Sequence, residues 1–151
     1  MAISTNERLQ MLQSASQAWV DLRQLLDEIP DAALRIPNTV GTWRGQDVII
    51  HLANWNEEAL NVLDRYAAGQ SPSWPLPEGV DNDVWNEERL APWRTATPAQ
   101  ARKYLNDTYE RLMHKAETMR GVRPNVVLGV TVYHFGEHMD DLRKVRDTAA
   151  D

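Results

Sequence analysis

Three of the four histidines in the sequence lie at positions where their side chains could bind one metal ion. His134 and His138 are four residues apart, and His51 lies in the apolar segment Asp-Val-Ile-Ile-His-Leu-Ala-Asn-Trp at residues 47–55. Side chains at positions i and i+4 of a helix project from the same face, with Cβ atoms about 6 Å apart. Neutral imidazole is the commonest protein ligand of metals. Three histidines that leave one coordination position open are typical of a catalytic rather than a structural metal site.

A histidine on an apolar helix face can also be an ordinary core residue that makes one hydrogen bond. For a single histidine this interpretation is the better one, but three together, two of them at the spacing of a clamp, favour a shared metal. The fourth, His114, has no other histidine at a helical spacing and is expected to face solvent. Glu137 and Asp141 lie close to the pair in sequence, and each could orient an imidazole or be a surface carboxylate.

Hydrophobic periodicity predicts four helices, over about residues 5–29, 43–68, 98–119 and 125–147. Ser4 and Glu7 predict a capping box for the first helix, and Thr42 is a candidate N-cap of the second. Thr97 is the expected N-cap of the third helix, followed by a proline at its first position. The second and fourth helices both carry histidines on their apolar stripes. Side chains of facing helices commonly build metal sites in the core of a bundle, so we expect the three histidines to meet there.

The connection between the second and third helices is long and rich in proline. Residues 70–80 contain three prolines, which exclude a regular helix, and a short helix is expected at 81–90. The chain shows no convincing strand alternation. It therefore predicts an all-α fold, a four-helix bundle with a long Pro-rich crossover between helices 2 and 3. A length of 151 residues favours one domain, 1–151.

Composition narrows the classes of partner. The net charge of -6 leads us to expect no nucleic acid as a partner, because binding to phosphates needs a basic face. Residues 120–123 and 143–146 cluster some positive charge, which solvated helix ends explain better than a binding patch. There is no basic, apolar leader and no apolar run of about 20 residues, so we expect no membrane partner and a cytoplasmic location. The absence of cysteine removes thiolate ligands and disulfides. Six tryptophans against one phenylalanine could line a pocket or fill core corners.

Two segments resemble signatures of the DinB/YfiT-like superfamily of metalloenzymes. Residues 42–52, Thr-Trp-Arg-Gly-Gln-Asp-Val-Ile-Ile-His-Leu, resemble its second-helix signature, and residues 134–142 resemble its fourth-helix His-x-x-x-His signature. Residues 85–87 are similar to the connection that leads into its third helix. The resemblance implies an up-down-down-up bundle, a homodimer, and a nickel or zinc ion on His51, His134 and His138.

The same resemblance implies an activity, either transfer of a low-molecular-weight thiol as co-substrate or hydrolysis of a small electrophile. A metal on three histidines could lower the pKa of bound water toward ~7 or bind a thiol. Glu58, two turns after His51, is our choice of general base, although a solvated carboxylate is the commoner role for such a residue. Asn54, Trp55 and Trp85 are expected to bind substrate, with simple core packing as the alternative for each tryptophan.

Three functions remain open from the sequence. The first is a metal-dependent transferase or hydrolase whose partner is a small-molecule substrate. The second is a protein that binds or sequesters a small molecule and uses its metal only for structure. The third is an interaction module whose metal is incidental.

Overall fold

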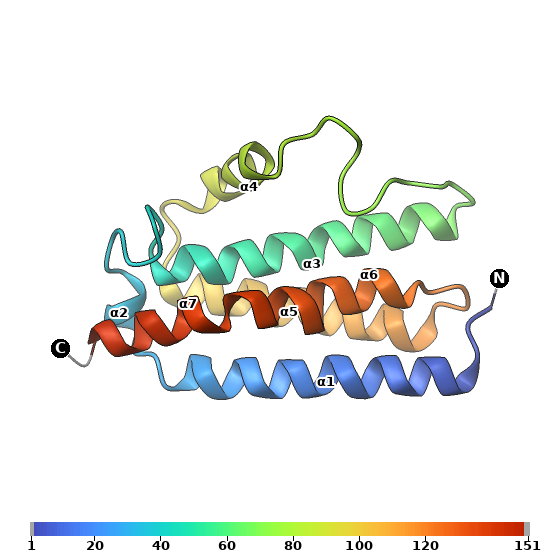
Figure 1. Ribbon diagram of the computed structural model, residues 1–151, viewed down its shortest axis with the longest axis horizontal. Coiled ribbons are helices and arrows are strands. Elements are labelled where there is room, and N and C mark those ends of the chain that lie inside the picture. Colours follow the sequence, from blue (N-terminus) through green and yellow to red (C-terminus); the bar gives the residue numbers. More distant parts are fainter. Residues whose placement is uncertain (1, 150–151) are drawn as a thin grey trace.

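The computed structural model describes residues 2–149 and is all-helical, as the sequence predicts (Figure 1). In that range the chain forms no β-strand, and Val40 and Trp43 make an isolated bridge. The elements are α1 (Thr5–Asp27), α2 (Asp31–Leu34), α3 (Gly45–Ala67), α4 (Asn82–Leu90), the 3-10 turn η1 (Ala91–Trp93), α5 (Pro98–Thr118), α6 (Pro124–Leu128), η2 (Gly129–Tyr133) and α7 (His134–Ala149). No helix in the described residues is long and apolar enough to cross a membrane.

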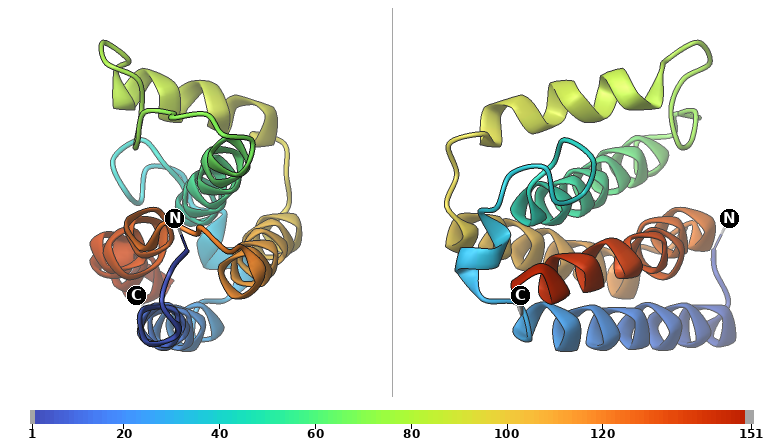
Figure 2. Two further views of the ribbon diagram at one scale, coloured as in Figure 1. Left: turned by 90° about the vertical axis from the view of Figure 1, so that its right-hand side faces the viewer. Right: turned by 60° about the vertical axis from the view of Figure 1, so that its left-hand side comes forward.

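Four long helical stretches lie side by side, namely α1, α3, α5 and the continuous run α6–η2–α7 (Figures 1 and 2). Figure 1 shows α1 and α7 running in one direction and α3 and α5 in the other. α3 contacts α5, α7 and α4, and α4 covers the side of α3 that faces away from α1. The histidine-bearing helices α3 and α7 are therefore neighbours.

The amino ends of two helices are capped as the sequence predicts. Ser4 Oγ accepts a hydrogen bond from the Glu7 backbone N–H at 3.1 Å. Thr97 and Gln100 form a reciprocal capping box, with distances of 3.1 Å and 2.8 Å. Each cap satisfies backbone donors that have no partner within the helix.

The second long helix starts at Gly45 rather than directly after Thr42, so the prediction of Thr42 as its N-cap is wrong. Residues 40–43 instead fold into a tight turn, in which the Trp43 backbone N–H donates to the Val40 carbonyl at 2.9 Å. The N-cap is Arg44, whose backbone N–H donates to Asp47 Oδ2 at 2.9 Å. The Arg44 guanidinium also pairs with the Asp47 carboxylate at 2.7 Å, which fixes the start of the helix that carries His51.

The first half of α3 is buried on all sides. Every residue from 45 to 56 is buried, including polar side chains that a one-sided amphipathic helix would expose. A helix that is enclosed all round is covered by several neighbours, here α5, α7 and α4. The sequence pattern identifies the apolar stripe of α3 but not the covering of its opposite face.

The fourth stretch is not one regular helix. Residues 129–133 form a π-helical segment directly before His134, where the sequence predicts an uninterrupted helix. Inside it, Thr131 Oγ1 donates to the Val127 carbonyl at 2.8 Å. π-helical turns are rare in α-helices and occur frequently at functional sites. This one lies where the fourth stretch reaches the histidines.

Candidate metal centre

The three histidines selected from the sequence meet in space. One ring nitrogen from each of His51, His134 and His138 lies within 4.8 Å of the others. The Nε2 atoms of His51 and His134 are 3.0 Å apart. The three ring centroids are separated by 4.7–4.9 Å, and each pair of ring planes is nearly perpendicular, at 76–82°. The three ring nitrogens are therefore close enough together to bind one metal ion.

Two of the three histidines are in the neutral state that binds a metal cation. Burial lowers the pKa of His51 to about 3 and lowers the pKa of His134 well below its ordinary value, with smaller contributions from the neighbouring imidazoles. Both rings are therefore neutral at physiological pH, and neutral imidazole is the form that binds metals. The donor set of three histidines fits a borderline divalent ion such as zinc or nickel.

Ordinary core hydrogen bonds do not account for buried His51 and half-buried His134. The described residues offer His134 Nε2 only the Nε2 of His51, and His134 Nδ1 is buried without any partner. A neutral imidazole carries one proton, so no tautomer of His134 satisfies both nitrogens with these neighbours. A metal ion bound to Nε2 would remove the need for a hydrogen bond between His134 and His51, and the proton of His134 would then lie on Nδ1, which has no partner among the described residues.

His138 is held differently. Its Nδ1 is 2.9 Å from Asp141 Oδ2, one turn further along α7. A carboxylate at this distance favours the tautomer with the proton on Nδ1 and leaves the Nε2 lone pair free to bind a metal. Glu137, the other carboxylate considered for this role, makes no hydrogen bond to any of the three rings in the described residues.

Removing this carboxylate is expected to weaken metal binding without unfolding the protein. Asp141→Asn should lower the affinity for zinc or nickel by about 10- to 100-fold, the usual cost of losing a hydrogen-bond partner of a metal-bound histidine. Competition with a chromogenic chelator would measure the dissociation constants. Asp140→Asn is the matched control, because Asp140 lies on the same helix with its side chain 94% exposed. Equal affinities for the two variants would contradict the role of Asp141.

The metal-free protein is expected to lose stability as the pH falls below about 6.5. An imidazole in the unfolded chain takes up a proton near this pH, whereas the pKa values of His51 and His134 are lowered by burial. Below that pH the unfolded state binds more protons than the folded state, so the free energy of unfolding decreases by roughly 1.4 kcal/mol per pH unit for each histidine. Urea unfolding between about pH 7.5 and pH 5, with chelator present, would measure the slope. A His51→Asn variant with the same slope would contradict this explanation.

The histidine cluster opens into a cavity of about 490 Å³ between α3, α7, α4 and the loop before α4. Its other lining residues are Trp55, Trp74, Pro75, Asn82, Asp83, Asn86, Gly129, Val130 and Glu137. The cavity thus joins the three nitrogens to an aromatic wall and to several polar side chains. This combination of a concave surface, apolar area and a few polar groups is typical of a small-molecule site.

Of the predicted substrate-binding residues, Trp55 lines this cavity. Its indole Nε1 donates to Asn86 Oδ1 at 3.0 Å. Trp85 is buried behind it, with ring centroids 4.5 Å apart, and holds Trp55 in place without reaching the cavity. Asn54 lies elsewhere, because its side chain turns toward α5 and accepts a hydrogen bond from the Tyr104 hydroxyl at 2.8 Å.

Glu58, the predicted general base, is not part of the cavity lining. It follows His51 by seven residues, which places it about 10 Å further along the helix axis. It is half-buried and has no hydrogen bond or ion pair within the described residues. The carboxylates that do reach the cavity are Asp83 and Glu137.

Most of the residues that line the cavity opposite the histidines were not predicted from the sequence. Trp74 lies in the Pro-rich segment, where no periodicity indicates the direction of a side chain. Asn82, Asp83 and Asn86 occupy α4, and their spacing of one and four residues is a polar helical face that could have indicated them. Glu137 was weighed as a partner of an imidazole rather than as a residue of the cavity.

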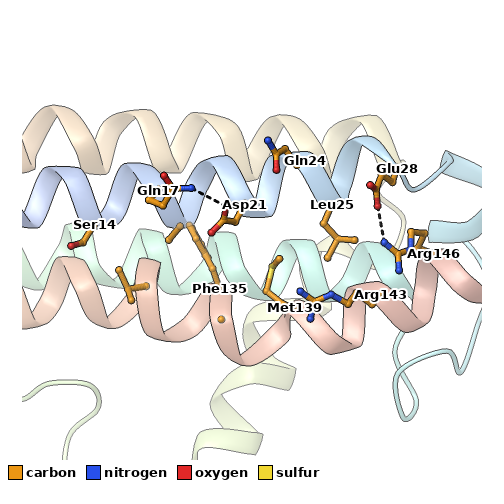
Figure 3. A pocket seen from close by; sticks show the side chains of 13 residues that line it. Ser14, Gln17, Asp21, Gln24, Leu25, Glu28, Phe135, Met139, Arg143 and Arg146 are labelled. Carbon is orange, nitrogen blue, oxygen red and sulfur yellow. Dashed lines mark hydrogen bonds and ion pairs between the residues drawn. The ribbon is translucent and has the colours of Figure 1, made fainter.

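A larger hollow lies between α1 and α7, on another face of the molecule (Figure 3). It has a volume of about 710 Å³, and none of the three histidines lines it. Arg146 of α7 donates to Glu28, the residue directly after α1, at 2.7 Å, and Gln17 donates to Asp21 at 2.9 Å; both contacts are drawn in Figure 3. Four of its polar side chains are therefore paired with one another.

Comparison with known proteins places the chain in a family and gives structures of the same fold. Residues 15–134 match the family described as mycothiol maleylpyruvate isomerase N-terminal domain, which is part of the DinB/YfiT-like superfamily. The crystal structure of the colibactin self-resistance protein ClbS in complex with a dsDNA is similar, with a TM-score of 0.77, 14% identity, and coverage of 92% of this chain and 94% of that one. An uncharacterised protein from Escherichia coli UTI89 gives a TM-score of 0.76, 12% identity, and coverage of 95% and 94%. No curated protein matches. At these identities the two structures show a shared fold.

The exclusion of nucleic acid as a partner is wrong. It was drawn from the acidic net charge, yet a protein of the same fold is in complex with dsDNA. Net charge averages over the whole surface and does not describe a local patch. In this chain, Arg120 and Arg123 line a cavity of about 490 Å³ that has no acidic side chain in its wall.

Proposed function

We propose that this chain, which belongs to the family of mycothiol maleylpyruvate isomerase N-terminal domains, is a metal-dependent enzyme that acts on a small electrophilic compound. The observation that carries the proposal is the cluster of three histidines, one buried and two half-buried, which opens into a cavity. His51, His134 and His138 would hold nickel or zinc, in keeping with the divalent metals typical of the superfamily. The reaction would be transfer of a low-molecular-weight thiol or hydrolysis.

The cavity residues have separate tasks in this proposal. A divalent metal bound by the histidines would supply a Lewis acid that lowers the pKa of a coordinated water or thiol. Trp55, fixed by Asn86 and by the ring of Trp85, forms a rigid apolar wall that orients the substrate and displaces water. Glu137 would accept the proton of the attacking water or thiol, because it is the carboxylate of α7 that lines the cavity.

Turnover assays separate the possible reactions. Metal-loaded protein would be incubated with 1-chloro-2,4-dinitrobenzene or a reactive ester, with and without glutathione or bacillithiol. We expect turnover that a chelator abolishes and that His134→Ala lacks. Dependence on the thiol would indicate a transferase, and turnover without it a hydrolase. Activity that survives removal of the metal would contradict the proposal, and metal-dependent ligand binding without turnover would favour the sequestering alternative.

The proton acceptor can be tested within the same assay. Glu137→Gln is expected to lower kcat by about 100-fold or more, the usual contribution of general base catalysis, with little change in metal content. Glu58→Gln is the matched variant at the residue first chosen from the sequence. A loss confined to Glu58→Gln would restore the original assignment.

We also propose an up-down-down-up four-helix bundle, a single domain over residues 1–151 and a homodimer, as the superfamily resemblance implies. Light scattering coupled to size-exclusion chromatography would give the mass of the particle in solution. A mass equal to the monomer at micromolar concentration would contradict the dimer.

A second candidate function, contact with duplex DNA, is favoured by the complex of the similar ClbS protein with dsDNA. The basic cavity at Arg120 and Arg123 is the part of this chain suited to phosphates, because both side chains are exposed and neither is in an ion pair within residues 2–149. Fluorescence anisotropy with a labelled duplex should then show binding that weakens steeply with salt. Replacing both arginines with glutamine should weaken it, whereas Lys103→Gln at the opposite end of α5 should not. Absence of binding at low salt would contradict this candidate.

A further inference from the structure

Asn86 of α4 is held in one orientation in the wall of the histidine cavity. Its Oδ1 accepts a hydrogen bond from the Trp55 indole N–H at 3.0 Å. An indole N–H can only donate, so the oxygen of the Asn86 amide is the atom that faces Trp55, and the amide nitrogen points away from it. The Asn86 side chain lines the cavity. Its NH2 group is therefore a hydrogen-bond donor with a fixed position beside the N–H edge of the Trp55 ring.

This donor is free and accessible. Within residues 2–149 the Asn86 amide nitrogen has no hydrogen-bond partner, yet it is not buried. In that part of the chain, the side-chain atoms that are buried without a partner belong to Gln46, Asn54, Asn56 and His134 instead. The hydrogen bond to the amide oxygen also polarises the group and strengthens its N–H bonds as donors. Asn86 can thus donate to a molecule that enters the cavity.

The residues on either side of Asn86 hold α4 in place. Trp85, the residue before it, is buried and packs on Trp55 with ring centroids 4.5 Å apart. Glu87, the residue after it, accepts a hydrogen bond from the Trp43 indole at 2.8 Å. A donor whose position is fixed before binding loses little conformational entropy when a ligand arrives.

The wall beside Asn86 suits a flat apolar group. Trp55 and Trp74 stand at 84° to each other with ring centroids 6.0 Å apart, and aromatic rings attract flat groups to their faces. A carbonyl oxygen accepts hydrogen bonds near the plane of its substituents, so the carbonyl of a flat group that stacks on Trp55 can meet a donor at the N–H edge of that ring. These wall groups are uncharged. What they select therefore does not depend on the balance between a metal cation and the carboxylates of Asp83 and Glu137.

We propose that Asn86 is a specificity-determining residue that selects substrates with a carbonyl oxygen attached to a flat apolar group. The flat group packs against Trp55 and Trp74, and the carbonyl oxygen accepts a hydrogen bond from the Asn86 NH2 group. Conjugated ketones, esters, thioesters and amides belong to this class, whereas alkyl halides lack a strong acceptor. This inference rests on the proposed function for the identity of the site and adds the chemical class of its electrophile.

Two uncharged probes of the same shape isolate the hydrogen bond. Acetophenone carries a carbonyl oxygen where α-methylstyrene carries a CH2 group, and both molecules are flat. Zinc-loaded, isotope-labelled protein would be titrated with each probe, and two-dimensional NMR would follow the side-chain NH2 signals of Asn86 and the indole N–H signal of Trp55. Both probes should perturb the Trp55 signal. Only acetophenone should shift the Asn86 NH2 signals downfield, because donating a hydrogen bond deshields the proton.

A matched pair of variants tests whether Asn86 sets the preference. Asn86→Asp keeps an oxygen for the Trp55 N–H and removes both amide protons. The affinity for acetophenone relative to that for α-methylstyrene should fall by about 3- to 10-fold, the range expected for one hydrogen bond between uncharged groups. Asn82→Asp is the control, because Asn82 lies one turn earlier on α4 and lines the same cavity, so that the variant gains the same charge while Asn86 is unchanged. It should keep the wild-type ratio.

The inference is overturned if Asn86→Asp keeps the wild-type ratio of affinities, if Asn82→Asp loses it equally, or if acetophenone binds without shifting the Asn86 signals. Failure of both probes to bind at millimolar concentration also overturns it. Zinc content, measured on the same samples, separates this inference from the proposed function. A protein that binds zinc but shows no effect of Asn86 overturns the inference alone. A protein that takes up no zinc but donates from Asn86 to acetophenone overturns the metal-dependent function and leaves the selectivity of the cavity standing.

Discussion

Replacing His138 with alanine is expected to lower the affinity for zinc or nickel by more than about 100-fold. Loss of a hydrogen-bond partner of a metal-bound histidine already costs about 10- to 100-fold, and loss of the ligand itself costs more. Two neutral imidazoles, His51 and His134, would remain with their Nε2 atoms 3.0 Å apart and would form a site with one ligand fewer. Competition with a chromogenic chelator would measure the affinities.

His114→Ala is the control for this variant. His114 is exposed on α5 and is outside the cluster, so its loss should leave metal binding unchanged. Circular dichroism would verify that both variants stay folded. The site is wrongly assigned if both variants bind metal as tightly as the wild type does.

The second large effect is expected from Phe135→Ala, which should lower the free energy of unfolding by about 3–5 kcal/mol. Phe135 lies between the two histidines of α7 and is 1% exposed. Its ring is 6.1 Å from that of Trp19 and 6.4 Å from that of Tyr109, two aromatic rings that stack at 4.0 Å. Truncation removes the buried ring and leaves a cavity that this cluster cannot fill.

Urea unfolding of the metal-free proteins would measure the loss. Tyr133→Ala is the control, because Tyr133 is two residues away and 67% exposed, and its loss should change the free energy of unfolding by no more than about 0.5 kcal/mol. Similar values for both variants would contradict the packing described for Phe135.

The sequence predicts the histidine cluster and the helices well because both depend on local spacing. To predict that His134 and His138 lie side by side, it is enough to know that they are in one helix. To predict that they meet His51, it is enough to know that the apolar stripes of the two helices face each other. The caps at Ser4 and Thr97 follow from the residue types at those positions. These features could be assigned without knowing which elements cover the helices.

The rest of the site depends on the long connection, which carries no periodic signal. Because residues 40–43 form a turn, α3 begins two residues later than the sequence predicts. α4 packs on the face of α3 that the sequence pattern assigned to solvent. The sequence also did not show that Asn54 accepts a hydrogen bond from Tyr104 of α5. Nor did it show that Glu137, and not Glu58, lines the cavity. The π-helical turn before His134 has no sequence signature that we could use.

Elemental analysis of the protein purified without a histidine tag tests the central claim most directly. The account predicts about one nickel or zinc ion per chain, either as purified or after addition of the metal and removal of the excess. The His134→Ala variant, treated in the same way, should contain none. A wild-type protein that contains no metal and takes up none would contradict the metal centre and the function built on it.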